Sequence, residues 1–172
     1  MIREMKTEDI PGVLQIEMTL QGRQWSSRAF EESLQQNYTY FYVTEASDRS
    51  IAGYCCIERL YEEAEIVNVA VHPNLRQQGI GESMLREVIE KEREAGTERI
   101  VLEVRESNFA AIRMYEKAGF VQLGIRRSFY EFPTEDAVIM QLLTEQNQER
   151  GLTMKESLSE RIRTVHGAAQ SE

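Results

Sequence analysis

A short apolar run followed by two closely spaced glycines is the feature of this sequence that most restricts its fold. Residues 69–71 read Val-Ala-Val, and they are followed by a proline-containing turn and then by Gly79 and Gly81. Apolar residues at helical spacing begin directly after the glycines and continue to Ala95. The pattern predicts a strand, a loop and a helix in that order, an arrangement typical of sheets covered by helices.

Glycines at the start of a helix allow backbone N–H groups to converge, because no Cβ obstructs them. Such amides form a site for an anion such as a diphosphate. The loop lacks the Gly-Lys-Ser/Thr of nucleotide-hydrolysing loops and the third glycine of dinucleotide-binding loops, which disfavours ATP and a dinucleotide-dependent oxidoreductase. A plain strand-to-helix turn explains the glycines equally well. The residues that would build the anion site are Arg76, Gln77, Gln78, Gly79, Ile80 and Gly81.

Strand and helix patterns divide the rest of the chain into a series of elements. Thr7 is the expected cap of the first helix and Asn108 the cap of the last. We expect an α/β (α+β) fold with a mixed, mostly antiparallel sheet of about six or seven strands flanked by about four helices. Strands are predicted over 1–5, 38–45, 51–60, 65–71, 99–104, 120–130 and 137–143, and helices over 7–21, 27–36, 79–95 and 108–118.

The length of 172 residues suits one domain, which we expect to span residues 1–143. From Thr144 onward Gln, Glu, Ser and Arg dominate. Residues 144–172 are therefore predicted to form a polar C-terminal tail that is either disordered or one short helix. The charged N-terminus does not resemble a signal peptide, so we expect a cytoplasmic protein.

The charge and the cysteines exclude several classes of function. The net charge of -9 argues against direct binding to nucleic acid, and no apolar run approaches the ~20 residues of a membrane span. Cys55 and Cys56 are adjacent, and neighbours in a strand point to opposite faces, so they suit neither a disulfide nor a metal site. We expect no metal, no membrane and no nucleic-acid partner; the sequence does not determine the oligomeric state, for which a monomer and a weak dimer are the two readings.

Two motifs resemble signatures of the GNAT superfamily of N-acetyltransferases. The first is the Arg-x-x-Gly-x-Gly loop that ends at Gly81, and the second combines residues 102–108, Ala111 and residues 114–120. The resemblance covers about residues 2–143 and implies acetyl-CoA as co-substrate, with its diphosphate on the glycine loop. It further implies that the strand edge at Val69, Ala70 and Val71 pairs with the pantetheine arm and polarises the thioester.

Within this superfamily the sequence is most similar to the RimI group, bacterial acetylases of protein N-termini. The matching segments are residues 68–73, 102–108, 126–130 and 136–140. This resemblance implies that the acceptor is the N-terminal alanine of a small-subunit ribosomal protein. Acetylation of a small amine such as a polyamine or an antibiotic remains an alternative, as does a CoA-binding module without catalysis.

Acetyl transfer to an amine needs a base for the amine and an acid for the departing thiolate. Glu103 interrupts an apolar strand, where partial burial makes a carboxylate a better base. A surface acid, or a partner of Arg105 or of a base on a neighbouring strand, fits the same pattern. Tyr115 is the candidate acid, because a phenol can protonate a thiolate. A tyrosine packed on the sheet is the alternative. The resemblance implies the catalytic role for both residues.

Other side chains are candidates for binding. Asn108 lies seven residues before Tyr115, on the same helical face, and is expected to contact the pantetheine arm or the diphosphate as well as cap its helix. Glu65, Arg126 and Tyr130 are the predicted acceptor-binding residues. Trp25 is expected in the opposite wall of the acceptor groove, although packing explains it as well. His72 fits a turn better than a titrating role.

The predicted mechanism is direct attack of the amine in a ternary complex. A covalent enzyme intermediate would need an activated Ser or Cys nucleophile. The two cysteines lie in a predicted strand without a nearby histidine.

Overall fold

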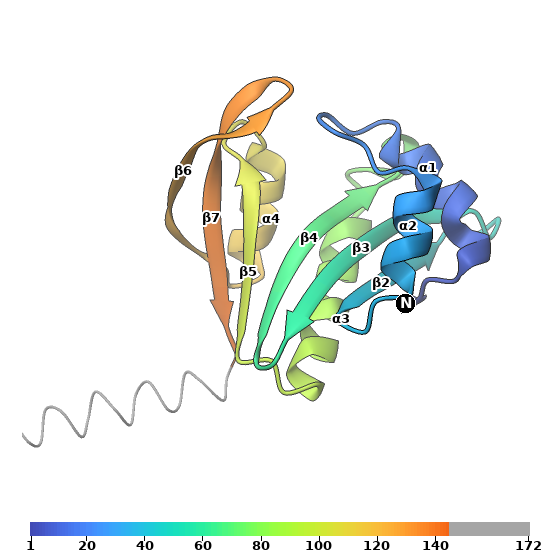
Figure 1. Cartoon of the computed structure of the whole chain (residues 1–172), viewed down its shortest axis with the longest axis horizontal. Helices are drawn as coiled ribbons and strands as arrows, with labels where there is room; N and C mark the ends of the chain where they lie inside the picture. Colours follow the sequence, from blue (N-terminus) through green and yellow to red (C-terminus); the bar gives the residue numbers. More distant parts are fainter. Residues whose placement is uncertain (145–172) are drawn as a thin grey trace, which may run out of the picture.

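A seven-stranded sheet forms the centre of the computed structural model, which describes residues 1–144 (Figure 1). The strand order is β1-β2-β3-β4-β5-β7-β6, with β4 and β5 parallel and the other neighbouring pairs antiparallel. The predicted mixed sheet is therefore confirmed. The strands are β1 (Ile2–Glu4), β2 (Thr39–Glu45), β3 (Ile51–Leu60), β4 (Glu63–Val71), β5 (Arg99–Arg105), β6 (Val121–Glu131) and β7 (Thr134–Leu143).

Helices cover both faces of the sheet. In Figure 1, α1 and α2 lie in front of β2, β3 and β4, whereas α3 and α4 lie behind the sheet. The described part of the chain contains no helix long and apolar enough to cross a membrane. Apart from Thr144, the predicted C-terminal tail lies outside the described residues. The helices are α1 (Ile10–Glu17), α2 (Ser27–Leu34), α3 (Ile80–Glu94) and α4 (Phe109–Lys117), with short 3-10 helices at Thr7–Asp9 and Pro73–Leu75.

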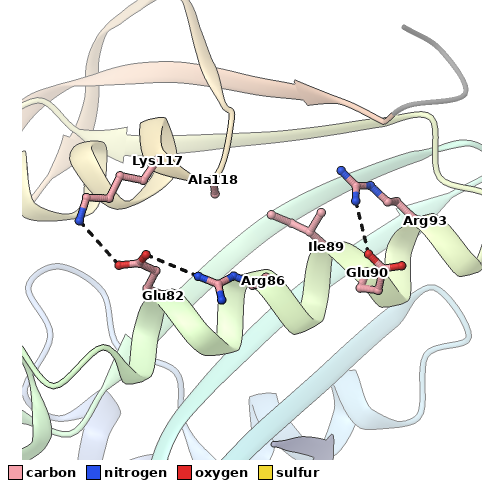
Figure 2. Close-up of a pocket in the computed structure, with 7 residues that line it drawn as sticks. All are labelled: Glu82, Arg86, Ile89, Glu90, Arg93, Lys117 and Ala118. Carbon is pink, nitrogen blue, oxygen red and sulfur yellow. Dashed lines mark hydrogen bonds and ion pairs between the residues drawn. The ribbon is translucent and has the colours of Figure 1, made fainter. Parts of the chain in front are cut away.

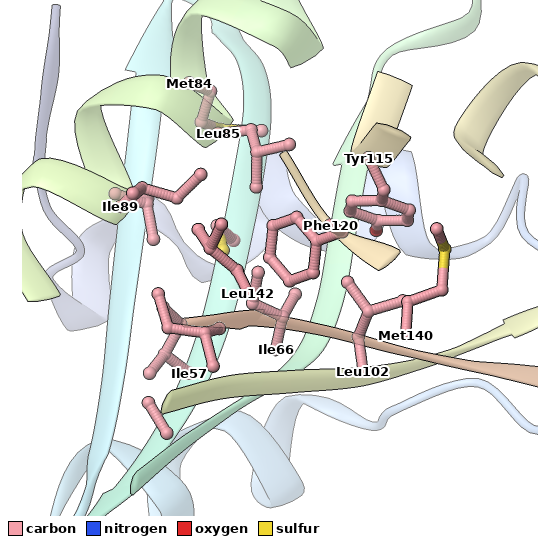
Figure 3. Close-up of a cluster of buried hydrophobic side chains, with 14 of the residues drawn as sticks. Ile57, Ile66, Met84, Leu85, Ile89, Leu102, Tyr115, Phe120, Met140 and Leu142 are labelled. Carbon is pink, nitrogen blue, oxygen red and sulfur yellow. The ribbon is translucent and has the colours of Figure 1, made fainter. Parts of the chain in front are cut away.

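Two apolar clusters fill the space between the sheet and its helices. The larger joins α3 and α4 to the sheet through residues such as Ile66, Leu102 and Phe120 (Figure 3). The smaller lies under α1 and α2. Cys55 belongs to the first cluster and Cys56 to the second, so the two side chains point to opposite faces, as predicted. Burial raises the pKa of both thiols, which makes them poor nucleophiles.

The two central parallel strands pair over only part of their length. Their register runs from Glu63 opposite Arg99 to Ile66 opposite Leu102, and beyond these residues β4 and β5 separate (Figure 1). The register between β3 and β4 shifts at the same level, which leaves Val67 as an extra residue in β4. A β-bulge of this kind bends a strand and increases its twist. Residues 67–71 therefore keep β3 as a neighbour on one side only.

The first helix differs from its prediction at both ends. Thr7 does not cap it: the carboxylate of Asp9 accepts the backbone N–H of Lys6 at 2.8 Å and closes a 3-10 turn before α1. The helix then ends at Glu17 instead of continuing to residue 21, because the Thr19 hydroxyl donates to the carbonyl of Ile16 at 2.6 Å and the chain turns away. Residues 18–26 form a loop.

The helix around Tyr115 begins as predicted. The Asn108 side chain accepts the backbone N–H of Ala111 at 3.2 Å, so Asn108 is the N-cap of α4. Gly96 and Gly119 follow the helices α3 and α4 with positive φ angles of 86° and 98°. Glycine is favoured at such positions because a Cβ is strained in this conformation.

Truncating Leu102 is expected to destabilise the protein strongly. Leu102 is 1% exposed and packs in the larger cluster, so Leu102→Ala should lower the free energy of unfolding by about 2–5 kcal/mol. Leu60→Ala is the matched control, because Leu60 is 62% exposed at the end of β3. Urea denaturation measures both variants. Equal losses of stability in the two would contradict this view of the core.

Candidate active site

The separation of β4 and β5 opens a cleft of ≈ 890 Å³. One wall is the loop that follows α1, including Trp25, and the opposite wall is the β6–β7 hairpin, including Tyr130. The backbone of β4 over residues 67–71 lines the cleft from the sheet, and α4 contributes Asn108 and Tyr115. The cleft thus brings together residues from distant parts of the sequence in a space large enough for a cofactor-sized molecule.

The glycine loop leads from the free edge of β4 into α3. Gln77 and Gly79 have positive φ angles of 61° and 78°, and no atom lies within 4 Å of a Cβ built on Gly79. Glycine at position 79 is therefore explained by backbone conformation and not by crowding. At Gly81 an added Cβ would lie 3.3 Å from Met114 Sδ and 3.4 Å from Val71 Cγ2. The start of α3 is thus packed closely against α4 and β4.

Arg76 connects this loop with the wall of the cleft. Its Nε donates to the carbonyl of Val71 at 3.0 Å, and its Nη2 donates to Thr19 Oγ1 at 3.3 Å. A guanidinium beside the N-terminus of a helix suits an anion. His72 is a turn residue, as predicted, because its Nδ1 accepts the backbone N–H of Asn74 at 3.3 Å.

Two carboxylates and one guanidinium lie together on the sheet face that carries the cleft. Arg126 Nη1 lies 3.0 Å from Glu103 Oε1, and the Glu103 side chain is 16% exposed. Glu103 therefore pairs with a base from another strand, one of the two pairings its sequence context allowed, and still lines the cleft. Burial, and then the nearby Glu103 carboxylate, raise the pKa of Glu65 above its ordinary value. These three predicted site residues are close in space.

Arg105 does not pair with Glu103. Its guanidinium stacks on the Tyr130 ring at 4.2 Å, forms an ion pair with Glu135 at 3.2 Å, and donates to the carbonyl of Phe132 at 3.1 Å. Burial raises the pKa of Tyr130 to about 12, although the Arg105 charge acts in the opposite direction. Arg105 therefore holds the β6–β7 hairpin that carries Tyr130 against the end of β5.

Tyr115 is 6% exposed and lies where α4 meets the cleft. Its ring packs edge-on against Phe120 with centroids 5.6 Å apart, and Figure 3 shows both rings within the larger apolar cluster. The residue is thus both a core tyrosine and a cleft residue. Burial raises the pKa of the Tyr115 phenol. A buried phenol keeps its proton until a strong acceptor such as a thiolate comes close.

A buried polar network beside the cleft is absent from the sequence-based predictions. Glu17 is 2% exposed, and its carboxylate accepts the backbone N–H of Trp25 at 2.8 Å and the Tyr54 hydroxyl. The Tyr54 oxygen in turn accepts Asn68 Nδ2 at 2.6 Å. One signal was available in the sequence: Glu17 falls four residues after Val13 and so continues the apolar stripe of its helix.

A smaller hollow of ≈ 200 Å³ lies between α3 and α4 (Figure 2). Its rim is made of exposed ion pairs, in which Glu82 lies 3.7 Å from Arg86 and 3.8 Å from Lys117, and Arg93 lies 3.4 Å from Glu90. These charges largely balance one another, and the free edge of β4 does not line the hollow. The larger cleft is therefore the candidate active site.

A parallel strand pair that separates beside a glycine loop, with an acid and a phenol at the opening, fits an acyltransferase that acts on a coenzyme A thioester. The chain belongs to the acetyltransferase (GNAT) family, whose sequence model matches residues 10–120. It is therefore an acyltransferase of a family that uses acetyl-CoA.

The relatives of this chain include enzymes with a named acceptor. The [ribosomal protein bS18]-alanine N-acetyltransferase of Escherichia coli K12 is 34% identical over 145 residues, which are 82% of this chain and 95% of the relative. A Bacillus subtilis protein that bears the same name provisionally is 37% identical over 139 residues, 81% of this chain and 92% of the relative. The resemblance to the RimI group, predicted from the motifs, is thus confirmed.

Solved structures agree with this assignment. The crystal structure of the ribosomal-protein-S18-alanine N-acetyltransferase from Escherichia coli has a TM-score of 0.75 at 32% identity, covering 83% of this chain and 92% of that one. A spermidine N-acetyltransferase from Vibrio cholerae has a TM-score of 0.77 at only 15% identity, covering 88% and 97% of the two chains. The second likeness supports the fold alone.

The Glu65 carboxyl, which lies near Glu103, is expected to make stability depend on pH. A raised pKa means that the folded state binds the Glu65 proton more tightly than the unfolded state does. Protonated Glu65 therefore contributes to stability below the ordinary carboxyl pKa, and this contribution to stability is lost as pH rises through the raised pKa. Glu65→Gln should therefore gain in free energy of unfolding relative to wild type between about pH 4 and about pH 8. Denaturant unfolding across this range measures the gain. An identical change in Glu116→Gln, on the exposed face of α4, would contradict it.

Proposed function

We propose that this protein transfers an acetyl group from acetyl-CoA to the α-amine of a protein N-terminus, and that the acceptor is a ribosomal protein that begins with alanine. The observation that carries the proposal is the position of Glu103, beside the free edge of β4 in a cleft with walls on both sides. The names of the relatives support the choice of acceptor. Such an acceptor places the reaction in the cytoplasm.

Several parts of the cleft suit the co-substrate. The amides of residues 76–81, with Arg76, would hold the diphosphate, and the Asn108 side chain would contact the pantetheine arm. The freed backbone of β4 at Val69, Ala70 and Val71 offers hydrogen-bonding groups to the amides of that arm. One of its N–H groups would polarise the thioester carbonyl as negative charge develops on the oxygen.

Glu103 is the proposed general base. An α-ammonium with a pKa of about 8 is mostly protonated at neutral pH and must lose a proton before it can attack. Arg126 forms an ion pair with Glu103, whose carboxylate is proposed to accept this proton directly or through a water molecule. Glu65, on the neighbouring strand, is proposed to bind the acceptor amine through its carboxyl oxygens. Tyr130, on the opposite hairpin, is proposed to bind the acceptor backbone.

Tyr115 is the proposed general acid. The amine nitrogen forms a bond to the carbonyl carbon, and the carbon–sulfur bond then breaks with its electron pair remaining on sulfur. The phenol proton of Tyr115 moves to that sulfur, and the second proton lost by the nitrogen, as the amide forms, restores the phenol. The proton taken by Glu103 returns to solvent. No covalent bond to the protein forms, which agrees with the buried, protonated state of Cys55 and Cys56.

Substitution of the two proposed catalytic groups should reduce turnover without abolishing co-substrate binding. Glu103→Gln and Tyr115→Phe are each expected to lower kcat by at least about tenfold, because each removes a proton-transfer group. The Kd for acetyl-CoA, measured by calorimetry, should stay within about threefold of wild type. Matched controls are Glu116→Gln and Tyr61→Phe, both on exposed residues. Unchanged kcat in both catalytic variants would refute these roles.

The acceptor class is tested by competition between substrates. Wild-type enzyme with acetyl-CoA is expected to acetylate a peptide that begins like ribosomal protein bS18 at least about tenfold more efficiently in kcat/KM than spermidine or an aminoglycoside. Mass spectrometry locates the acetyl group on the α-amine. A matched peptide with a blocked N-terminus should remain unmodified. Turnover of the small amines without turnover of the peptide would show that the enzyme acts on small amines.

A further inference from the structure

One buried carboxylate connects two separate walls of the cleft. Glu17 Oε1 accepts the backbone N–H of Trp25 at 2.8 Å, and Glu17 Oε2 accepts the Tyr54 hydroxyl. Tyr54 is itself bonded to Asn68 Nδ2 at 2.6 Å. The hydrogen bonds therefore run without a break from the loop after α1 to the free edge of β4. Trp25 and Asn68, at the two ends of this chain, both line the cleft.

A buried carboxylate at position 17 is expected to lower the stability of the fold. Glu17 is 2% exposed, and among residues 1–144 no lysine or arginine forms an ion pair with it. Burying a carboxylate without a cation is unfavourable in general, and an apolar side chain of similar volume is often more stabilising. Position 17 continues the apolar stripe of α1, so a leucine or methionine would fit it. The hydrogen bonds of the Glu17 carboxylate to Trp25 and Tyr54 therefore explain its presence better than a gain in stability does.

The Trp25 end of the network fixes a segment that has no helix or strand of its own. Residues 18–26 are irregular, and Trp25 packs its ring on Phe30 at 5.2 Å and on Phe41 at 5.8 Å between centroids. These ring contacts hold the side chain, whereas the bond to Glu17 holds the backbone. The two together determine how far the loop reaches over the cleft.

The Asn68 end of the network lies on the part of β4 that β5 does not cover. Asn68 follows the bulged residue Val67, where the strand is bent. The Tyr54 hydroxyl oxygen accepts a hydrogen bond from the Asn68 amide, which fixes the orientation of the Asn68 side chain beside the cleft. Tyr54 is fully buried and hydrogen-bonded to both Glu17 and Asn68, so a shift of Glu17 is expected to move Asn68.

We propose that Glu17 is a positioning residue for the acceptor: it holds the loop of residues 18–26 and the Asn68 side chain at a fixed separation, so that the amine is directed toward Glu103. This inference rests on the proposed function. It assigns Glu17 and Tyr54 to acceptor binding and gives them no part in proton transfer.

Three variants distinguish the two arms of the network. The loop arm runs from Glu17 to Trp25, and the Asn68 arm runs from Glu17 through Tyr54 to Asn68. Glu17→Met removes both arms and keeps the volume. Glu17→Gln keeps an oxygen for the Trp25 N–H, but its amide and the Asn68 amide then both donate toward the Tyr54 oxygen, and the Tyr54 hydrogen loses its acceptor, so the Asn68 arm is weakened while the bond to Trp25 is kept. Tyr54→Phe cuts the Asn68 arm alone. Glu17→Gln and Tyr54→Phe should therefore behave alike.

The loop arm has a readout that does not depend on catalysis. Trp25 is the only tryptophan of the chain, so the intrinsic tryptophan fluorescence reports on this loop alone. The acrylamide quenching constant should rise about twofold in Glu17→Met and stay at the wild-type value in Glu17→Gln and Tyr54→Phe, because only the first loses the bond to Trp25. Circular dichroism spectra confirm that each variant is folded.

The contribution of the network to acceptor binding is measured by steady-state kinetics with the peptide that begins with alanine. The peptide KM should rise about fivefold in Glu17→Gln and Tyr54→Phe and at least about tenfold in Glu17→Met, while kcat stays within about threefold and the KM for acetyl-CoA is unchanged. A general loss of structure would instead change all of these constants together.

Three results overturn the proposal. They are an unchanged quenching constant in folded Glu17→Met, a peptide KM within about twofold of wild type in Tyr54→Phe, and a fall in kcat without a change in peptide KM. If Glu17→Met does not fold, Glu17→Gln and Tyr54→Phe decide the question through the peptide KM. Failure of the proposed function is distinct, since wild-type enzyme would then acetylate no peptide, and the quenching constants would still test the loop arm.

Discussion

The separation of β4 from β5 is the feature on which the rest of the site depends. Hydrogen bonding between the two strands ends at Ile66 and Leu102, and the bulge at Val67 turns β4 away. Backbone groups that would be paired inside a continuous sheet are thereby left facing a cleft, where they need other partners. The larger apolar cluster, which joins α3 and α4 to both strands, holds the two halves of the sheet together despite the missing pairing.

Side chains on the two faces of the central strands have different tasks. Ile66 and Leu102 point into the cluster under α3 and α4, whereas Glu65 and Glu103 lie on the opposite face with Arg126. Strand alternation produces this division from neighbouring residues in the sequence. The groups proposed for proton transfer are therefore carried by elements that the core fixes in place. The walls proposed for the acceptor are the loop of residues 18–26 and the β6–β7 hairpin, which meet Glu65 and Asn68 of β4 at the sheet.

The sequence contained enough information to predict the strands, the main helices and the glycine loop. Periodicity located these elements, and local signals such as Asn108 and Gly96 marked their ends correctly. The early end of α1 at Glu17 was not predictable in this way, because it depends on the hydrogen bond from the Thr19 hydroxyl to the carbonyl of Ile16, which leaves no periodic pattern in the sequence. The roles of Glu103 and Tyr115 stay predictions, although both residues line the cleft. The Arg126 partner of Glu103 comes from a strand whose register the sequence does not specify.

The contacts of Arg105 are a second feature that the sequence did not predict. Its sequence position, two residues after Glu103, suggested a simple local pair, but its guanidinium instead reaches Tyr130, Phe132 and Glu135 on the hairpin. The hairpin and the 18–26 loop form the walls proposed for the acceptor, and α3, α4 and β4 form the part proposed for the co-substrate. If these proposals hold, substitutions in the walls alter the choice of acceptor with little effect on the thioester site. On this proposal, the acceptor and the acetyl donor are held by separate elements of one fold, so a change in one site can leave the other intact.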